Sequence, residues 1–141
     1  MAFSIELLDD FASDLKSRLG AITIGSYVER FVAATEYWDI TRYRYHWHEA
    51  ITRILQGSVK SALITSMYDP AVANFIYWWP MYRLGQIVQF QNHILFLNEL
   101  EQFDPNDPFH FVPERITIND DGEKISEWSA SIEDLERFLS N

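Results

Sequence analysis

Hydrophobic residues are densest between residues 61 and 97, a stretch in which only Asp69 and Arg83 carry a formal charge. Two turn-forming pairs, Asp69-Pro70 and Leu84-Gly85, divide it into segments rich in β-branched and aromatic residues, which is typical of β-strands. Both faces of the middle segment are apolar, so we expect each face to be covered by helices or by a partner. The predicted strands span residues 59–67, 72–82 and 86–92, with 94–97 continuing or bending away.

Two amphipathic segments precede this sheet and predict helices. In the first, Phe3–Leu19, apolar residues recur at helical spacing, and acidic residues precede basic ones, the order that the helix dipole favours. The second covers residues 39–56, where apolar residues repeat at spacings of three and four between Asp39, a suitable N-cap, and Gly57, which suits the position after the last turn. We expect the other face of this helix, which includes His46, to be solvated.

The remaining segments complete an α+β pattern. Residues 21–35 predict one long or two short strands, with Gly25 marking a turn or bulge. Residues 101–113 contain three prolines and predict a loop held against the body of the protein. An Asp-Gly turn predicts a β-hairpin over residues 116–128, and Ser131 begins a Ser-x-x-Asp sequence that predicts the cap of a short C-terminal helix.

Length and composition bound the class of protein. At 141 residues, of which 48 % are hydrophobic and 23 % charged, the chain is expected to form one globular domain over residues 1–141. The lack of cysteine excludes disulfides, thiolate metal sites and cysteine nucleophiles. The N-terminus is too acidic for a secretory signal, and no apolar run approaches the roughly 20 residues of a membrane helix. We therefore expect a soluble cytoplasmic protein.

Negative charge is concentrated at one end of the chain. Residues 98–141 hold twelve acidic and three basic residues, whereas the rest of the chain is close to neutral within a net charge of −10. An acidic surface repels nucleic acid and attracts a basic protein. A simpler interpretation, that the acids only keep the protein soluble, explains the composition equally well.

The sequence assembles no recognisable active site. His46 and His48 lie two apart in a predicted helix, so they face different directions and cannot share a metal ion. The oxygen-rich turn at residues 119–123 lacks the calcium-loop pattern, and motifs for serine nucleophiles, phosphate loops and dinucleotides are absent. His93 and His110 stand among apolar neighbours, where a hydrogen-bonded structural histidine is the usual finding. We expect no enzymatic activity, no cofactor and no metal.

A set of short motifs follows in a fixed order from Tyr37 to the C-terminus. They are Tyr37-Trp38-Asp39-Ile40, Ser61-Ala62-Leu63, Ser66-Met67-Tyr68 with Pro70, Asn74-Phe75-Ile76, Gln91-Asn92, Phe96-Leu97, and Asp121-Gly122 followed by Lys124-Ile125-Ser126-Glu127-Trp128. In this order and spacing the motifs resemble immunity proteins of bacterial contact-dependent growth inhibition (CDI) systems, in the branch paired with a ribosomal-RNA nuclease toxin related to colicin E3. Residues 1–36 show no such resemblance.

The resemblance implies a cytoplasmic protein with a twisted antiparallel sheet flanked by helices, which forms a heterodimer with the C-terminal nuclease domain of its own system's toxin. It would neutralise the toxin by occluding its RNA-binding or active surface. An RNA-cutting toxin needs a basic surface, so acids at the contact would speed its capture. The expected contacts are Asp104, Asp107, Glu114, Asp120, Asp121, Glu123 and Glu127, with Trp78 or Trp128 as an exposed anchor. Trp128 could equally fix the hairpin to the core.

Two other classes of protein stay open. One is a small ligand-binding α+β domain or enzyme, for which a converging set of His, Asp and Ser is missing. The other is a nucleic-acid-binding module built on an aromatic sheet, which would need Arg42, Arg44, Arg53 and Arg83 on one surface.

Overall fold

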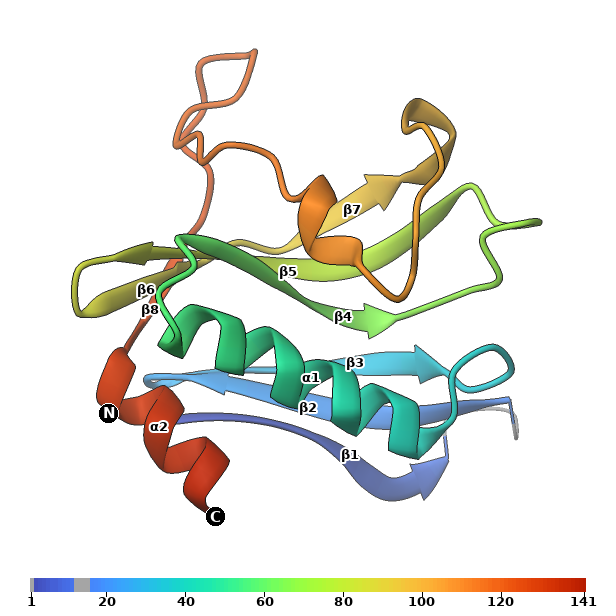
Figure 1. The fold of residues 1–141 in the computed structure, drawn as a ribbon, viewed down its shortest axis with the longest axis horizontal. Coiled ribbons are helices and arrows are strands. Elements are labelled where there is room, and N and C mark those ends of the chain that lie inside the picture. The colour runs from blue at the N-terminus through green and yellow to red at the C-terminus, as the bar shows by residue number, and fades with distance from the viewer. Residues whose placement is uncertain (1, 12–15) are drawn as a thin grey trace.

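The computed structural model describes residues 2–11 and 16–141, and within them the chain forms two antiparallel sheets and two α-helices (Figure 1). The smaller sheet has the order β1-β2-β3, and the larger has the order β4-β5-β6-β8, with β7 also paired to β5. The strands are β1 (Phe3–Phe11), β2 (Ser17–Ile24), β3 (Tyr27–Ala34), β4 (Lys60–Ser66), β5 (Phe75–Leu84), β6 (Ile87–Phe90), β7 (His93–Phe96) and β8 (Trp128–Ser131). The helices are α1 (Ile40–Leu55) and α2 (Ile132–Ser140), with short 3₁₀ helices η1 (Leu97–Glu99) and η2 (Pro108–Phe111).

The N-terminal segment is a strand, so the helix predicted over Phe3–Leu19 is wrong wherever the structure describes it; residues 12–15 lie outside the described part. Phe3, Ile5 and Leu7 are buried and alternate with more exposed residues, which is the period of a strand with one face on the core. Their backbone pairs with β2, and this pairing decides between two patterns that the apolar spacing alone permits.

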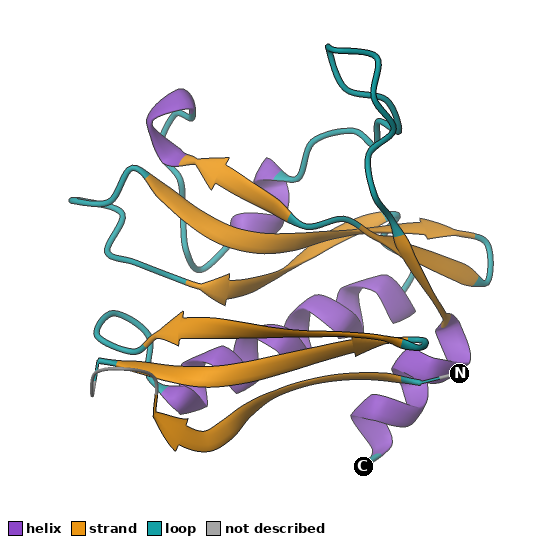
Figure 2. Cartoon of the chain, turned by 180° about the vertical axis from the view of Figure 1, so that it is seen from behind, coloured by secondary structure: helices purple, strands orange, loops and turns teal. Residues whose placement is uncertain are grey.

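Residues 21–35 contribute to two short strands, one of the two predicted alternatives. Gly25 has a φ of 64° in the turn that joins β2 to β3, a conformation that glycine adopts at little steric cost. The inner face of the small sheet packs against the larger one, where Phe3 stacks on Phe90 with ring centroids 5.4 Å apart. Seen from behind, β3 of the small sheet lies beside β4 of the larger one (Figure 2).

The central strand of the larger sheet is β5. Its predicted start at residue 72 moves to Phe75, because Asp69 begins a turn and its Oδ1 accepts a hydrogen bond from the N–H of Ala71 at 2.9 Å. β6 and β7 pair with the same edge of β5 in one continuous register, from Leu84 opposite Ile87 to Phe75 opposite Phe96. The strands predicted from the densest hydrophobic stretch are therefore confirmed, apart from these bounds.

Helix α1 confirms the helix predicted over residues 39–56. The Asp39 side chain accepts a hydrogen bond from the N–H of Arg42 at 2.8 Å, and Gly57 has a φ of 109° just after the last turn. The helix lies along the free edge of β4, and its aromatic side chains bond that edge. Trp47 Nε1 donates to the carbonyl of Ile64 at 2.7 Å. This contact blocks the edge of β4 against other strands.

The C-terminal segment departs from its predicted hairpin over residues 116–128. Only an isolated bridge between Ile118 and Lys124 forms there, and Trp128 instead begins β8, which pairs with β6. The predicted cap of α2 is confirmed: Ser131 Oγ accepts from the N–H of Asp134, and Asp134 Oδ2 accepts from the N–H of Ser131, both at 3.0 Å.

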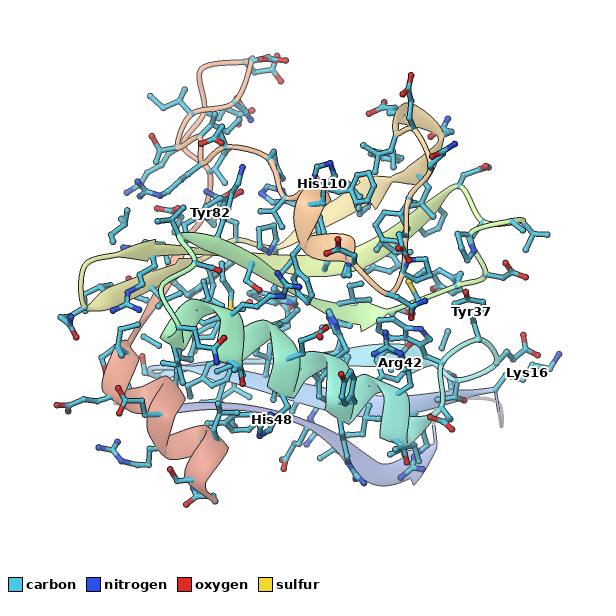
Figure 3. The ribbon with its side chains drawn as sticks, in the orientation of Figure 1. Lys16, Tyr37, Arg42, His48, Tyr82 and His110 are labelled. Carbon is cyan, nitrogen blue, oxygen red and sulfur yellow. The ribbon has the colours of Figure 1, made fainter. Side chains whose placement is uncertain are left out.

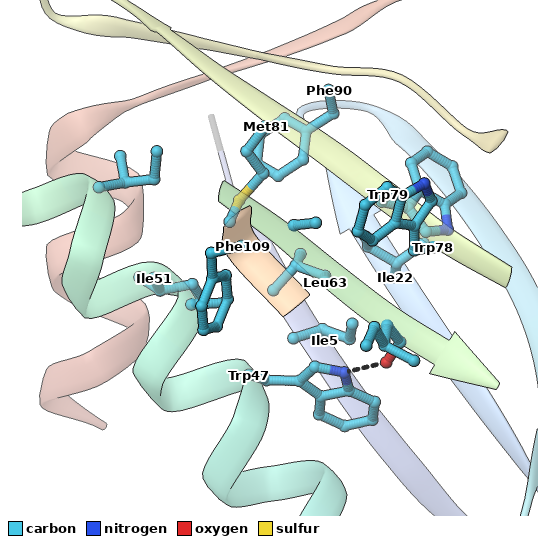
Figure 4. Packing of buried hydrophobic residues seen from close by; sticks show 14 of the residues in the cluster. Ile5, Ile22, Trp47, Ile51, Leu63, Trp78, Trp79, Met81, Phe90 and Phe109 are labelled. Carbon is cyan, nitrogen blue, oxygen red and sulfur yellow. Dashed lines mark hydrogen bonds between the residues drawn. The ribbon is translucent and has the colours of Figure 1, made fainter. Parts of the chain in front are cut away.

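The core lies between the two sheets and α1 and is rich in aromatic residues (Figure 4). Trp47, Trp78 and Trp79 are each buried, together with Ile22 of the small sheet and Leu63 of β4. Helix α1 therefore connects both sheets into one core. Within residues 2–11 and 16–141, no helix is long and apolar enough to cross a membrane.

Candidate functional site

The acidic turn at Asn119–Glu123 projects from the body of the protein (Figure 1). The Asn119 side chain holds the turn by accepting hydrogen bonds from the N–H groups of Asp121 and Glu123, at 3.0 and 2.9 Å. Asp120, Asp121 and Glu123 are exposed, and none of them forms an ion pair with a residue in the described ranges. The turn thus presents three carboxylates to solvent.

Two other predicted contact residues, Glu114 and Glu127, fix the base of this projecting segment. Glu127 receives two hydrogen bonds from Arg115, at 2.9 and 2.7 Å, and one from Gln91 at 2.8 Å. The bonds from Arg115 lower the pKa of Glu127. Glu114 pairs with Lys60 at 2.8 Å. Both carboxylates already have cationic partners within the chain.

Asp104 and Asp107 lie on a second loop, which packs along α1. Asp104 accepts a hydrogen bond from the N–H of Asn106 at 2.8 Å, and Asp107 lies 3.9 Å from Arg53. Arg53 also lies over the ring of Phe109 at 4.2 Å. Each aspartate is exposed, so the predicted acids form two groups on two loops.

Neither of the two candidate tryptophan anchors is freely exposed. Trp78 is only 1 % exposed and offers no surface to a partner in this conformation. Trp128 is partly buried between two aromatic rings: its centroid lies 4.5 Å from Tyr27 and 5.3 Å from Trp79. Trp128 therefore joins the small sheet to the large one, the structural role that its position also allowed.

The arginines that a nucleic-acid surface would need are mostly engaged in internal contacts. Arg42 donates to Asn106 Oδ1 at 3.2 Å and lies over the Trp38 ring at 4.4 Å. Arg83 donates to the carbonyl of Ile54 at 2.7 Å, near the end of α1. These side chains bind loops and helix ends and do not form one free basic patch with Arg44.

His46 is buried, so its predicted solvated position is wrong. Its Nε2 accepts the N–H of Ile64 on β4 at 2.8 Å, and its ring stacks on Phe109 with centroids 5.7 Å apart. Burial, helped by the charge of Arg42, lowers the pKa of His46 to about 3. His93 is hydrogen-bonded to Gln91 at 2.7 Å, as predicted. His48 is exposed, as expected for the solvated face of α1, whereas His110 is also exposed, contrary to the structural position that its apolar neighbours indicated (Figure 3).

An open cleft between β3 and β5, which we call the inter-sheet cleft, is a feature that the sequence did not indicate. It encloses about 1290 Å³ and is lined by residues of both sheets and of the turn after β4. Phe31, Tyr77 and Trp79 form an aromatic wall of the cleft, and Lys16 and Tyr37, which also line it, lie on the same side of the molecule (Figure 3). The two sheets contact each other near both ends of β3, where Tyr27 stacks on Trp128 and Ala34 donates to Ser66, and the cleft lies between these two contacts.

Comparisons with known proteins identify the family. A family model described as the CdiI N-terminal domain matches residues 33–138, about three quarters of the chain. The chain belongs to the CdiI family. A curated CdiI relative, "Immunity protein CdiI" of Enterobacter cloacae subsp. cloacae, is 36 % identical over 118 residues, which cover 84 % of this chain and 81 % of the relative.

A solved structure extends the likeness beyond the CdiI family match. A chain of the CdiA-CT/CdiI toxin and immunity complex from Enterobacter cloacae superposes with a TM-score of 0.90 at 32 % identity, covering 98 % of this chain and 96 % of that one. The family match begins at residue 33, but the structural match includes the small sheet. The resemblance inferred from the motifs is thus confirmed at the level of the CdiI family, and it extends to the N-terminal strands, where the motifs gave no signal.

Proposed function

We propose that this chain is the immunity protein of a CdiA-CT toxin and immunity pair, and that it neutralises its toxin by binding it. The observation that carries the proposal is the likeness over 98 % of the chain to part of a toxin and immunity complex. Membership of the CdiI family supports the same assignment. Binding alone is sufficient for this role, so the proposal needs no catalytic residue.

The proposal extends to the kind of toxin. We propose that the partner is an RNA-cutting nuclease domain, bound one to one in the cytoplasm, and that the chain covers its RNA-binding or active surface. The order of the motifs from Tyr37 onward supports the branch paired with ribosomal-RNA nucleases. The acidic surplus also supports it, because a nuclease that binds phosphates needs a basic surface and a basic surface attracts carboxylates.

The projecting turn is the best-placed part of the predicted contact surface. Asp120, Asp121 and Glu123 are exposed without an ion-pair partner among the described residues, so their charge is available for steering. Asp104 on the second loop is likewise exposed. The other proposed contacts, Asp107, Glu114, Glu127 and Trp128, have partners within the chain and would contribute by shape and by shared hydrogen bonds.

The experiment is to co-express the chain with the toxin domain encoded beside it, purify the complex by a tag on one partner, and measure association kinetics by stopped flow. A triple variant, D120K/D121K/E123K, should slow association by roughly tenfold or more at low salt, with a smaller effect at high salt. The matched control, E99K/E133K/E136K, changes the net charge equally at three other exposed positions.

The outcomes separate the parts of the proposal. Slower association of the first variant alone supports contact at the projecting turn. Equal slowing of both variants would mean that only net charge acts, and wild-type rates for both would place the interface elsewhere. Failure of the wild-type chain to bind the toxin domain at all would refute the assigned function.

A further inference from the structure

We infer that the inter-sheet cleft is the docking groove for an extended segment of the toxin, which adds a strand to the open edge of β3. The inference rests on the proposed function, because it takes the toxin as the partner. It concerns a surface different from the acidic turn, and it follows from three features of the cleft: an unpaired strand edge, an exposed apolar face and a surplus of negative charge.

The first feature is the edge of β3. The N–H of Thr35 donates to the carbonyl of Lys16, so these two residues form a hydrogen-bonded pair of the β2–β3 ladder. Such pairs alternate with non-bonded pairs along an antiparallel ladder. The backbone N–H and C=O groups of Val28, Arg30 and Val32 therefore point away from β2. Within residues 2–11 and 16–141, no hydrogen bond to these outward groups forms. An unpaired edge of this kind is a template for another strand.

The last residue of β3 shows how the rest of this edge is satisfied. Ala34 donates its N–H to Ser66 Oγ at 3.1 Å, and its carbonyl accepts from the Tyr43 hydroxyl at 2.5 Å. The edge of β4 is likewise bonded by α1, through His46 and Trp47. The open stretch is therefore confined to residues 28–32 of β3, of which Glu29, Phe31 and Val32 line the cleft.

The second feature is the face of β5 and β7 that extends beyond the small sheet. Phe75 lies opposite Phe96 and Tyr77 opposite Ile94, and directly paired residues share a face. All four side chains are between 37 and 48 % exposed, which is unusual for two adjacent apolar pairs. Asn92, on the same face, donates a hydrogen bond to the Glu29 side chain of β3 at 3.0 Å, a side-chain contact that a docked strand would displace. This apolar face continues directly from the aromatic wall of the cleft.

The third feature is charge. The cleft is lined by three acidic residues, Glu29, Glu36 and Asp69, and by one basic residue, Lys16. Lys16 pairs with Glu36 at 3.3 Å, which leaves a negative surplus at the rim. A nucleic acid would be repelled there, whereas a segment with lysine or arginine would be attracted.

The size of the cleft suits a peptide segment. Its volume of about 1290 Å³ exceeds the roughly 300–1,000 Å³ of ordinary small-molecule pockets. The open stretch from Val28 to Val32 is about 13 Å long at 3.3 Å per residue, enough to pair with about five residues of the partner. In such a strand every second side chain points into the cleft, so we expect apolar residues against Tyr77 and Phe75, interspersed with cationic residues at the rim.

The test uses the full chain with its toxin domain and compares matched variants. V32P removes one outward N–H, which an edge strand tolerates, whereas V32T keeps the N–H and the size of the side chain. F75A and Y77A shorten the exposed aromatic pair, whereas L84A shortens another exposed apolar residue, at the far end of β5. Unfolding by urea confirms that each variant is folded. Hydrogen exchange of the amides of Val28, Arg30 and Val32 is measured with and without the toxin.

We expect V32P, F75A and Y77A to weaken toxin binding by at least about tenfold and V32T and L84A to bind within about twofold of wild type. The three outward amides should exchange rapidly in the free chain and slowly in the complex. If the wild type binds the toxin but the cleft variants bind equally well and the amides stay unprotected, the docking groove is refuted while the proposed function stands. If the amides are already protected without toxin and the chain self-associates, the occupant is a second copy and the inference is also overturned. A wild-type chain that binds no toxin refutes the proposed function itself.

Discussion

The buried histidine on α1 allows a quantitative prediction about acid stability. His46 accepts the N–H of Ile64 through Nε2, and protonation of that nitrogen would break the bond and leave a charge in the core. The folded state therefore holds His46 neutral, with a pKa of about 3. Since this pKa lies below the value of the unfolded chain, the folded state is favoured above about pH 6.5 and loses stability as the pH falls toward 3.

The magnitude follows from the two pKa values. With about 3 in the folded chain and about 6.5 in the unfolded chain, the free energy of unfolding should fall by about 2 kcal/mol between pH 8 and pH 5. Burial also lowers the pKa of His93, which adds to the loss in the same direction. Hydrogen bonds lower the pKa of Glu127, but a carboxylate of this kind acts mainly below pH 5.

The assay is urea unfolding followed by tryptophan fluorescence from pH 5 to pH 8. H46Q cannot be protonated in this range, and its side-chain oxygen can still accept the N–H of Ile64. H46Q should lower the free energy of unfolding by about 1–2 kcal/mol at pH 8, because the ring contacts of His46 with Phe109 and Trp38 are lost. At pH 5 the wild type has lost about 2 kcal/mol and H46Q has not, so the difference in stability between the two chains should shrink by that amount. H110Q, at an exposed position, is the control and should keep the wild-type pH dependence. An H46Q chain that loses as much stability on acidification as the wild type would refute the reasoning.

Two further predictions concern the fold. G20A should destabilise the chain by about 1–3 kcal/mol in urea unfolding, because the added Cβ would overlap the ring of Phe31 on the neighbouring strand β3. The double variant G20A/F31L should recover part of this loss. A G20A chain as stable as wild type would contradict the close approach of Gly20 and Phe31. D39A should cost about 1 kcal/mol through loss of the N-cap of α1, whereas D39S should remain near wild type, and equal stability of all three chains would show that the cap does not matter.

The sequence was sufficient to predict those elements whose ends and periodicity depend only on their own residues. Helix α1 has apolar residues at helical spacing between Asp39 and Gly57, and both ends are observed where these residues place them. The cap of α2 at Ser131 is equally local. The strands of the larger sheet were also predictable, because their β-branched and aromatic segments are separated by clear turns.

Pairing between distant residues decided the rest. Phe3, Ile5 and Leu7 alternate with the period of a strand, whereas the apolar spacing from Leu7 to Leu19 also fits a helix, and pairing with β2 selects the strand. Trp128 was expected to close a hairpin but pairs with Phe90, thirty-eight positions earlier. His46 was assigned to a solvated face by residue type, although it lies three positions after Tyr43 and shares its buried side. The inter-sheet cleft depends on how two separate sheets pack against each other, so no local pattern could reveal it.

The central claim is that this chain silences a toxin by binding it, and with the proposed RNA-cutting toxin as the partner an RNA-cleavage titration tests it most directly. The toxin domain encoded beside the chain is incubated with ribosomes while increasing amounts of the purified chain are added, and the RNA fragments are quantified. The account predicts that cleavage stops at one equivalent of the chain and that the chain itself cuts no RNA. Cleavage that continues at full rate in excess chain would contradict the account.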